Sequence, residues 1–191
     1  MCKAVGLSSD TSCSSFSYLG QNPGAWRLSS LRLKEAADVL RQTGWPDERK
    51  EHDLEVATAD FRLGPVYMLL IGMALEAGLK AILVAQNPAL IGEQRISRDI
   101  TTHRLKVLWD RVRFPKSRAT ESVLDRLERF VVAFGRYPVS KAMHDMKSMT
   151  GASFHADPDF DEVARLWASL EEQTKEVMPE LFTEQGSGES V

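Results

Sequence analysis

The sequence predicts an all-α protein, folded as an up-and-down bundle of about five or six helices. One apolar run is long enough for a central helix, and the other apolar residues recur every three or four positions, the period of an amphipathic helix. No stretch alternates apolar and polar residues as a half-buried strand does. With 43% hydrophobic and 27% charged residues among 191, the composition is that of a globular chain with one sizeable core.

The central helix is expected over Pro65–Gln86, PVYMLLIGMALEAGLKAILVAQ. Proline has no N–H to leave unpaired in a first turn, and Asn87 ends the helix because a residue before a proline avoids the α conformation. The only charged residues in the run are Glu76 and Lys80. They share one helix face and are expected to form an ion pair. The run is long enough to span a bilayer, but two charges in its middle argue against a membrane protein.

The other helices are expected on either side of this run, each with a residue that caps or stops it. One runs from Ser29 or Ser30, both good N-caps, to about Thr43, where Gly44 stops it, and a short one follows from Asp53. Three more are expected later in the chain: residues 103–112 capped by Thr101 or Thr102, a helix from Thr120 to Phe134 stopped by Gly135, and one from Asp157 through Val177.

One domain with two tails is expected. Residues 1–24 have no helical period and are rich in serine, so a disordered tail is predicted there. Residues 25–182 are expected to form a single helical bundle domain, followed by a polar tail over 183–191. Cys2 and Cys13 lie in the first tail, so neither a disulfide framework nor a metal site is predicted. The start of the chain lacks a sustained apolar stretch, and we expect a cytoplasmic protein.

Charge is distributed unevenly, although the net charge of the whole chain is only −3. The segment Arg95–Arg118, which we call the basic segment, has eight Lys or Arg residues against two Asp, a net charge of +6. From Asp157 to the end, two cations stand against ten acidic residues, a net charge of −8. Two interpretations stay open. The basic segment holds phosphates, or it and the acidic last helix neutralise each other, within one chain or across a dimer.

Three pieces of the sequence occur in a recognisable order. They are MALEAGLKAIL in the central helix, Thr102–Leu105 (THRL) at the start of a short helix, and Gly135–Pro138 (GRYP) after a long one. Over residues 28–178 this order resembles the HEPN superfamily, the higher eukaryotes and prokaryotes nucleotide-binding domain. The family pattern usually has an acidic residue after the histidine, where this chain has Arg104.

The resemblance implies a HEPN-like bundle, usually a homodimer, without metal or other cofactor. Members bind nucleotides or RNA, partner a nucleotidyltransferase, or act as metal-independent RNases in toxin and phage-defence systems. Carried onto this sequence, it implies that Lys80, His103, Arg136 and Tyr137 bind a nucleotide. We therefore expect a non-catalytic or weakly active nucleotide- or RNA-associated module of a bacterial defence, toxin–antitoxin or regulatory system.

Two other functions stay open. RNase members of the family use an Arg-x(4–6)-His motif, in which histidine is the acid or base and arginine stabilises the phosphorane charge. Arg136 and His144 have seven residues between them, one too many, and Pro138 follows Arg136 closely. Arg98 and His103 have the right spacing but lie ahead of the short helix. The third function is a purely structural dimerisation module.

Each of these residues also has a structural interpretation. An exposed Glu76–Lys80 pair would add only a few tenths of a kcal/mol. Apolar neighbours predict at least partial burial, and a buried pair needs further partners, which His103 or Arg136 is expected to supply. In the structural interpretation, His103 serves only the turn before its helix, and Arg136 and Tyr137 cap the preceding helix and pack in the core.

Overall fold

The computed structural model describes residues 11–44, 54–134 and 156–186. The protein is an all-α helical bundle, as the sequence predicted, and the described residues form no strand. The main helices are α1 (Thr11–Gln21), α2 (Pro23–Gly44), α3 (Leu54–Gln86), α4 (Leu105–Val112), α5 (Arg118–Arg129) and α7 (Ala156–Val177). Shorter helical segments are η1 (Pro88–Leu90), η2 (Phe130–Phe134) and η4 (Pro179–Gly186).

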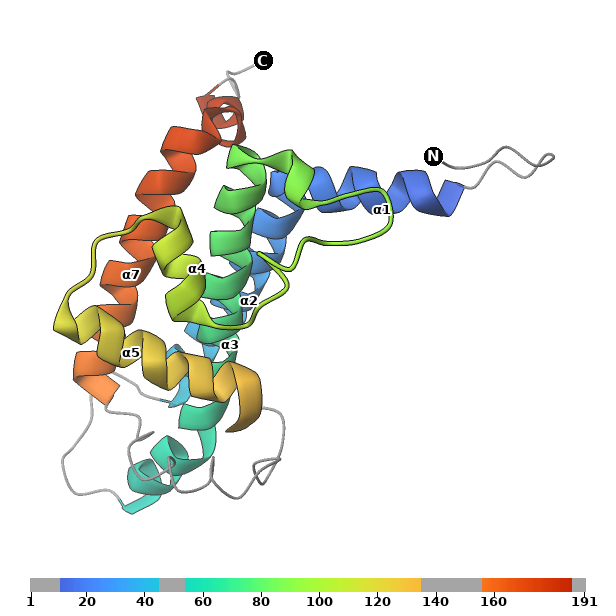
Figure 1. Ribbon diagram of the computed structural model, residues 1–191. Coiled ribbons are helices and arrows are strands. Elements are labelled where there is room, and N and C mark those ends of the chain that lie inside the picture. Colours follow the sequence, from blue (N-terminus) through green and yellow to red (C-terminus); the bar gives the residue numbers. More distant parts are fainter. Residues whose placement is uncertain (1–10, 45–53, 135–155, 187–191) are drawn as a thin grey trace.

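Helix α3 is the axis of the bundle. It makes contacts with α2, α4, α5 and α7, which lie around it in Figure 1. From Leu63 to Gln86 its side chains are buried on nearly every side, because apolar residues occupy most of these positions. The fully buried large side chains come chiefly from α3 and from the inner faces of α4 and α5: Met68, Ile71, Leu75, Leu79, Ile82, Leu105, Leu108, Trp109, Leu124 and Leu127.

The part Leu63–Gln86 of α3 is long and apolar enough to cross a membrane by length and composition. Its most apolar window is 72% buried inside the bundle. Burial of that kind is consistent with the core helix of a soluble protein, which needs an apolar surface on every side that its neighbours cover.

The start of α3 differs from the prediction. The sequence predicted a short helix from Asp53 and a separate helix beginning at Pro65, whereas one continuous helix begins at Leu54 and Pro65 lies inside it. An interior proline removes one hydrogen bond and costs about 3 kcal/mol. Leucine, alanine and glutamate supply five of the eleven residues 54–64, and leucine and alanine are also frequent after the proline. These strong helix formers on both sides favour one continuous helix.

The predicted disordered tail over residues 1–24 is wrong for its second half. Thr11–Gln21 forms α1, and α2 begins at Pro23 rather than at Ser29 or Ser30. Proline suits a first helical position. Trp26 Nε1 donates to the Gly20 carbonyl, six residues away, at 2.8 Å. A contact distant in sequence also holds the end of α1, because Gln21 Nε2 donates to the Ile91 carbonyl at 2.7 Å. A local sequence pattern contains no signal for such contacts.

The capping residues of α4 and α5 also differ from those expected. Thr102 Oγ1 accepts the Arg104 N–H at 3.1 Å, and α4 begins only after Arg104. Ser117 rather than Thr120 is the N-cap of α5, because its Oγ accepts the Thr120 N–H at 3.0 Å. Thr120 is thus the third residue of the helix. The predicted stop at Gly135 lies outside the described residues.

Two acidic residues of α7 pair with cations of other helices. Asp159 is 1% exposed and pairs with Arg126 of α5, while Glu171 pairs with Arg27 of α2. Both cations lie outside the basic segment, so that segment and α7 do not neutralise each other through these pairs. Breaking a buried pair leaves an uncompensated charge, and these contacts therefore fix α7 against α2 and α5.

Two glycines let other elements approach α3 closely. A Cβ atom at Gly72 would lie 2.6 Å from Val131 Cγ2. A Cβ atom at Gly78 would lie 2.9 Å from Ser30 Oγ of α2 and would overlap Leu170 of α7. The absence of a side chain at Gly78 thus sets the distance from α3 to two neighbouring helices.

Replacing Gly78 by alanine should destabilise the protein, although alanine in an open helix interior is favoured by about 1 kcal/mol. Overpacking against Ser30 and Leu170 costs about 1–3 kcal/mol, so we expect a net loss in the free energy of unfolding, measured by urea denaturation. Adding Leu170→Val should recover part of the loss, because the two changes share one contact. A Gly78→Ala variant more stable than wild type would contradict this packing.

Candidate functional site

Three charged or titratable side chains meet where α4 begins beside α3. Lys80 Nζ donates to Glu76 Oε1 at 2.6 Å, and the side chains of Lys80 and Glu76 are only 7% and 11% exposed. His103 Nδ1 lies 3.0 Å from Glu76 Oε1 and 3.1 Å from Oε2. The His103 side chain is 49% exposed. We call these three residues the Glu76 cluster.

Local structure on both elements brings the cluster together. Glu76 and Lys80 are one helical turn apart on α3, which places both on one face. His103 lies in the turn that Thr102 caps, and the next buried residue, Leu105, anchors the first turn of α4 against the core. The turn therefore holds the imidazole over the carboxylate of α3.

The Glu76 cluster determines which nitrogen of the His103 ring carries the proton. A carboxylate only accepts hydrogen bonds, so Nδ1 carries the proton that faces Glu76. In the neutral ring, Nε2 then has the free lone pair. In the part of the chain that the structure describes, nothing is hydrogen-bonded to Nε2, and the ring is half exposed. The cluster thus presents one oriented imidazole nitrogen on the surface.

A second group of charges connects α4 to α5 next to this turn. Lys106 Nζ donates to Asp125 at 2.6 Å, Arg129 donates to the same carboxylate at 2.6 Å, and Arg104 Nε donates to Glu128 at 3.2 Å. Partial burial by itself would raise the pKa of the Asp125 carboxyl, but hydrogen bonds from Lys106 and Arg129 outweigh it and hold the pKa below its ordinary value.

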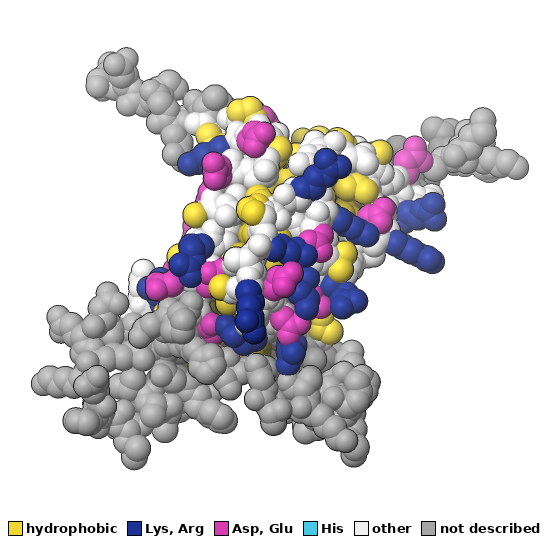
Figure 2. All heavy atoms as spheres, turned by 60° about the vertical axis from the view of Figure 1, so that its left-hand side comes forward, with side chains coloured by type: hydrophobic (Ala, Val, Ile, Leu, Met, Phe, Trp, Pro, Cys, Tyr) yellow, Lys and Arg dark blue, Asp and Glu magenta, His cyan; other side chains and the backbone are white. Residues whose placement is uncertain are grey.

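Half of the cations in the basic segment already have acidic partners. Ion pairs join Arg104 to Glu128, Lys106 to Asp125, Arg111 to Asp99 and Lys116 to Asp110. The other four cations are exposed and form no ion pair within the described residues: Arg95, Arg98, Arg113 and Arg118. Figure 2 shows Lys and Arg side chains interspersed with Asp and Glu on one face of the molecule. Only part of the predicted positive charge is therefore available to a ligand.

Three of the predicted site residues lie together in the structure: Glu76, Lys80 and His103. Because Lys80 is buried against Glu76, its ammonium is not presented to solvent. Arg98 lies in the exposed loop before α4. The other predicted site residues, Arg136, Tyr137 and His144, lie outside the described residues.

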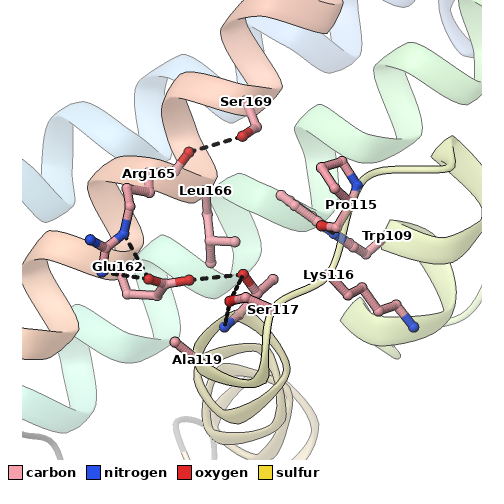
Figure 3. A pocket seen from close by; sticks show the side chains of 10 residues that line it. Trp109, Pro115, Lys116, Ser117, Ala119, Glu162, Arg165, Leu166 and Ser169 are labelled. Atoms are coloured by element: carbon pink, nitrogen blue, oxygen red, sulfur yellow. Dashed lines mark hydrogen bonds and ion pairs between the residues drawn. The ribbon is translucent and has the colours of Figure 1, made fainter.

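A cleft of about 510 Å³ lies between the α4–α5 loop and α7 (Figure 3). Several of its polar side chains are paired: Thr120 Oγ1 donates to Glu162 at 2.9 Å, Arg165 Nε donates to the same carboxylate at 2.8 Å, and the Lys116 ammonium pairs with Asp110, which does not line the cleft. The Thr120–Glu162 hydrogen bond joins the start of α5 to α7. No local sequence pattern marks this cleft, because its two walls are more than 40 residues apart in the chain.

The described residues hold no group of three or more His, Cys, Asp and Glu side chains that fits a metal ion. The fold and the Glu76 cluster define an all-α bundle that displays one oriented histidine. Comparison with protein-family models, with curated proteins and with solved structures finds no match to this chain.

Removing Glu76 should destabilise the protein strongly. In Glu76→Ala the Lys80 ammonium stays buried without its partner, and breaking a buried pair costs about 3–5 kcal/mol. His103→Ala should cost far less, because the ring is half exposed. Free energies of unfolding from urea denaturation, compared at one pH, check both values.

Lys34 and Asp38 provide the matched control, because they form the same one-turn pair at 2.6 Å with 21% and 41% exposed side chains. Asp38→Ala should cost only about 0.3–0.5 kcal/mol. If Glu76→Ala and Asp38→Ala are equally mild, the Glu76 cluster is an ordinary surface pair. A combined Glu76→Leu, Lys80→Met variant should recover most of the lost stability, since it leaves no charge buried.

Proposed function

We propose that the protein is a HEPN-like, non-catalytic or weakly active module that associates with nucleotides or RNA. The observation that carries the proposal is the half-exposed His103 ring, held by a buried carboxylate beside a segment with unpaired arginines. The sequence resemblance also supports the proposal, since Glu76, Lys80 and His103 belong to the motifs that resemble the family. A cytoplasmic bacterial defence, toxin–antitoxin or regulatory system is the proposed setting, with a nucleotidyltransferase-type protein as a candidate partner.

The chemistry of the exposed groups fits a phosphate-containing ligand. Guanidinium groups bind phosphate through several N–H donors in a fixed plane. The oriented Nε2 of His103 accepts a hydrogen bond from a ribose hydroxyl when the ring is neutral and donates to a phosphate when it is protonated. Lys80 contributes indirectly, by holding Glu76, because its own ammonium is buried. Arg98 and His103 are therefore the proposed contacts among the described residues.

Binding of a labelled single-stranded RNA at low salt, followed by fluorescence anisotropy, tests this proposal. His103→Ala should weaken binding about tenfold, because a hydrogen bond to a charged group is worth about 1.5 kcal/mol or more. Arg98→Ala should lower the slope of log affinity against log salt by about 0.7, the value for one phosphate contact with a single strand.

Arg32→Ala is the control, because Arg32 is an exposed arginine of α2 away from the proposed contacts. It should leave the affinity unchanged within about twofold. The proposal fails for the RNAs used if wild type does not bind at low salt. It also fails if Arg98→Ala and His103→Ala behave like Arg32→Ala.

The contact between Glu76 and His103 favours one second candidate, a metal-independent endoribonuclease. A general base needs an unprotonated, accessible nitrogen in a fixed orientation, and Glu76 gives Nε2 of His103 these properties. Nε2 would take the proton of a ribose 2′-hydroxyl while that oxygen attacks the adjacent phosphorus. The bond from phosphorus to the 5′-oxygen of the next nucleotide breaks, that oxygen leaves with a proton from water, and a 2′,3′-cyclic phosphate remains. Arg98 would stabilise the charge that develops on the phosphate oxygens.

Under this second candidate, purified protein cuts RNA in the presence of EDTA, and His103→Ala abolishes the cutting without loss of the folded state. His144→Ala tests the other sequence-predicted pair, Arg136 and His144. Cutting that His144→Ala abolishes and His103→Ala does not would assign the chemistry to that pair instead. Intact RNA after prolonged incubation would leave binding as the function.

A further inference from the structure

The His103 imidazole has the geometry of a nucleophile as well as that of a base. Its Nδ1 lies 3.0 Å from Glu76 Oε1, so that nitrogen carries the proton and the lone pair is on Nε2. The His103 side chain is half exposed, whereas the Glu76 side chain that holds it is 11% exposed. A histidine nitrogen with an accessible lone pair forms covalent bonds to electrophiles. The ring thus combines a fixed nitrogen with a reactive one.

The charges around the ring favour an electrophile that is itself an anion. Lys80 donates to Glu76 at 2.6 Å, and its positive charge offsets that of the carboxylate. Arg104 directly follows His103, and its 68% exposed side chain forms one ion pair, through Nε. Arg98 is exposed and has no ion pair in the part of the chain that the structure describes. Helix α4 begins directly after Arg104, so the positive end of its dipole also lies at this turn.

We propose that His103 is a phosphorylation site, at which Nε2 accepts a phosphoryl group from a donor with a P–N or an acyl-phosphate bond. The Nε2 lone pair forms the new bond to phosphorus while the bond from phosphorus to the donor nitrogen or oxygen breaks. A protonated donor nitrogen leaves as a neutral amine, and an acyl oxygen leaves as a carboxylate. The Nδ1 proton stays between His103 and Glu76, whose negative charge stabilises the positive charge that the ring gains.

The chemistry of the product determines the class of donor. The P–N bond of phosphohistidine is hydrolysed with a large release of free energy, so an ordinary phosphate monoester has too little driving force to form it. A phosphohistidine on another protein and a small acyl phosphate both have enough. Phosphoramidate has the P–N bond of the first source, and acetyl phosphate represents the second.

A phosphoryl group on His103 would also regulate the proposed RNA site, and this consequence rests on the proposed function. The group adds about two negative charges and occupies Nε2, the atom proposed to contact RNA. Repulsion between this group and the RNA phosphates weakens binding. The phosphoryl transfer itself does not depend on RNA, so the two proposals can fail separately.

Incubation of the full chain with phosphoramidate, and separately with acetyl phosphate, tests the modification. Phosphorus NMR distinguishes a phosphate on Nε2 from one on Nδ1, and loss of the signal in His103→Gln assigns it. We expect the Nε2 product, formed about tenfold faster in the folded protein than at His103 of the urea-unfolded chain. The reason is that a hydrogen bond to a charged group contributes about a factor of ten or more. Reaction with only one of the reagents identifies the source of the phosphoryl group.

The combined Glu76→Leu, Lys80→Met variant tests whether the buried pair is responsible. Its His103 should react as slowly as in the unfolded chain and at both nitrogens, because nothing then fixes the Nδ1 proton. The matched control is Asp38→Leu with Lys34→Met, which removes the one-turn pair of the same kind on α2. The control should keep the wild-type rate and the Nε2 product. Far-UV circular dichroism checks that both variants are folded.

Three results would overturn the phosphorylation site: no phosphate on His103 with either reagent, a phosphate on Nδ1, or a rate in the folded protein no higher than in urea. An unchanged rate and product in the variant without the buried pair would overturn the role of Glu76. Phosphorylated protein should bind RNA at least about tenfold more weakly than unmodified protein, and equal affinities would overturn the regulation. If unmodified protein does not bind RNA, the proposed function fails while transfer to His103 still supports the phosphorylation site.

Discussion

The buried ion pair of Glu76 and Lys80 is the constraint on which the site depends. An ammonium group removed from water at the centre of an apolar helix requires a partner, and Glu76 supplies it at 2.6 Å. The carboxylate has a second oxygen to satisfy, and His103 Nδ1 meets it from the turn before α4. One pair of charges thus fixes the register of α3 against the start of α4, and with it the outward direction of the histidine.

Ion pairs with buried members also join other helices of the bundle. Arg27 of α2 and Arg126 of α5 hold acidic residues of α7, whose Asp159 is almost completely buried. Close contact at Gly78 sets the spacing of α3 from α2 and α7. Directional ion pairs thus orient the outer helices, while apolar packing against α3 supplies most of the stabilisation. A rigid scaffold of this kind is what a surface histidine needs to keep one orientation.

The sequence was sufficient for features that depend on local periodicity and spacing. It predicted the all-α class and the apolar helix, and it proposed the Glu76–Lys80 pair with His103 as a further partner. It failed where distant contacts decide the structure. Helix α1 is stabilised by contacts with Ile91, about 70 residues away, and the pair of Arg27 with Glu171 spans 144 residues. Neither contact leaves a signal in the local sequence pattern. Helix α3 also continues through Gly64 and Pro65, although both residues are unfavourable in a helix interior.

We propose that the buried pair holds His103 with its Nδ1 protonated and leaves Nε2 free for a ligand. Nitrogen-15 NMR of the histidine rings, recorded with and without single-stranded RNA and assigned with His103→Ala, tests it most directly. We predict that neutral His103 is the tautomer protonated at Nδ1, that Lys80→Met with Glu76→Leu abolishes this preference, and that added RNA shifts the Nε2 resonance. A neutral ring protonated at Nε2, with a resonance that RNA leaves unchanged, would contradict the account.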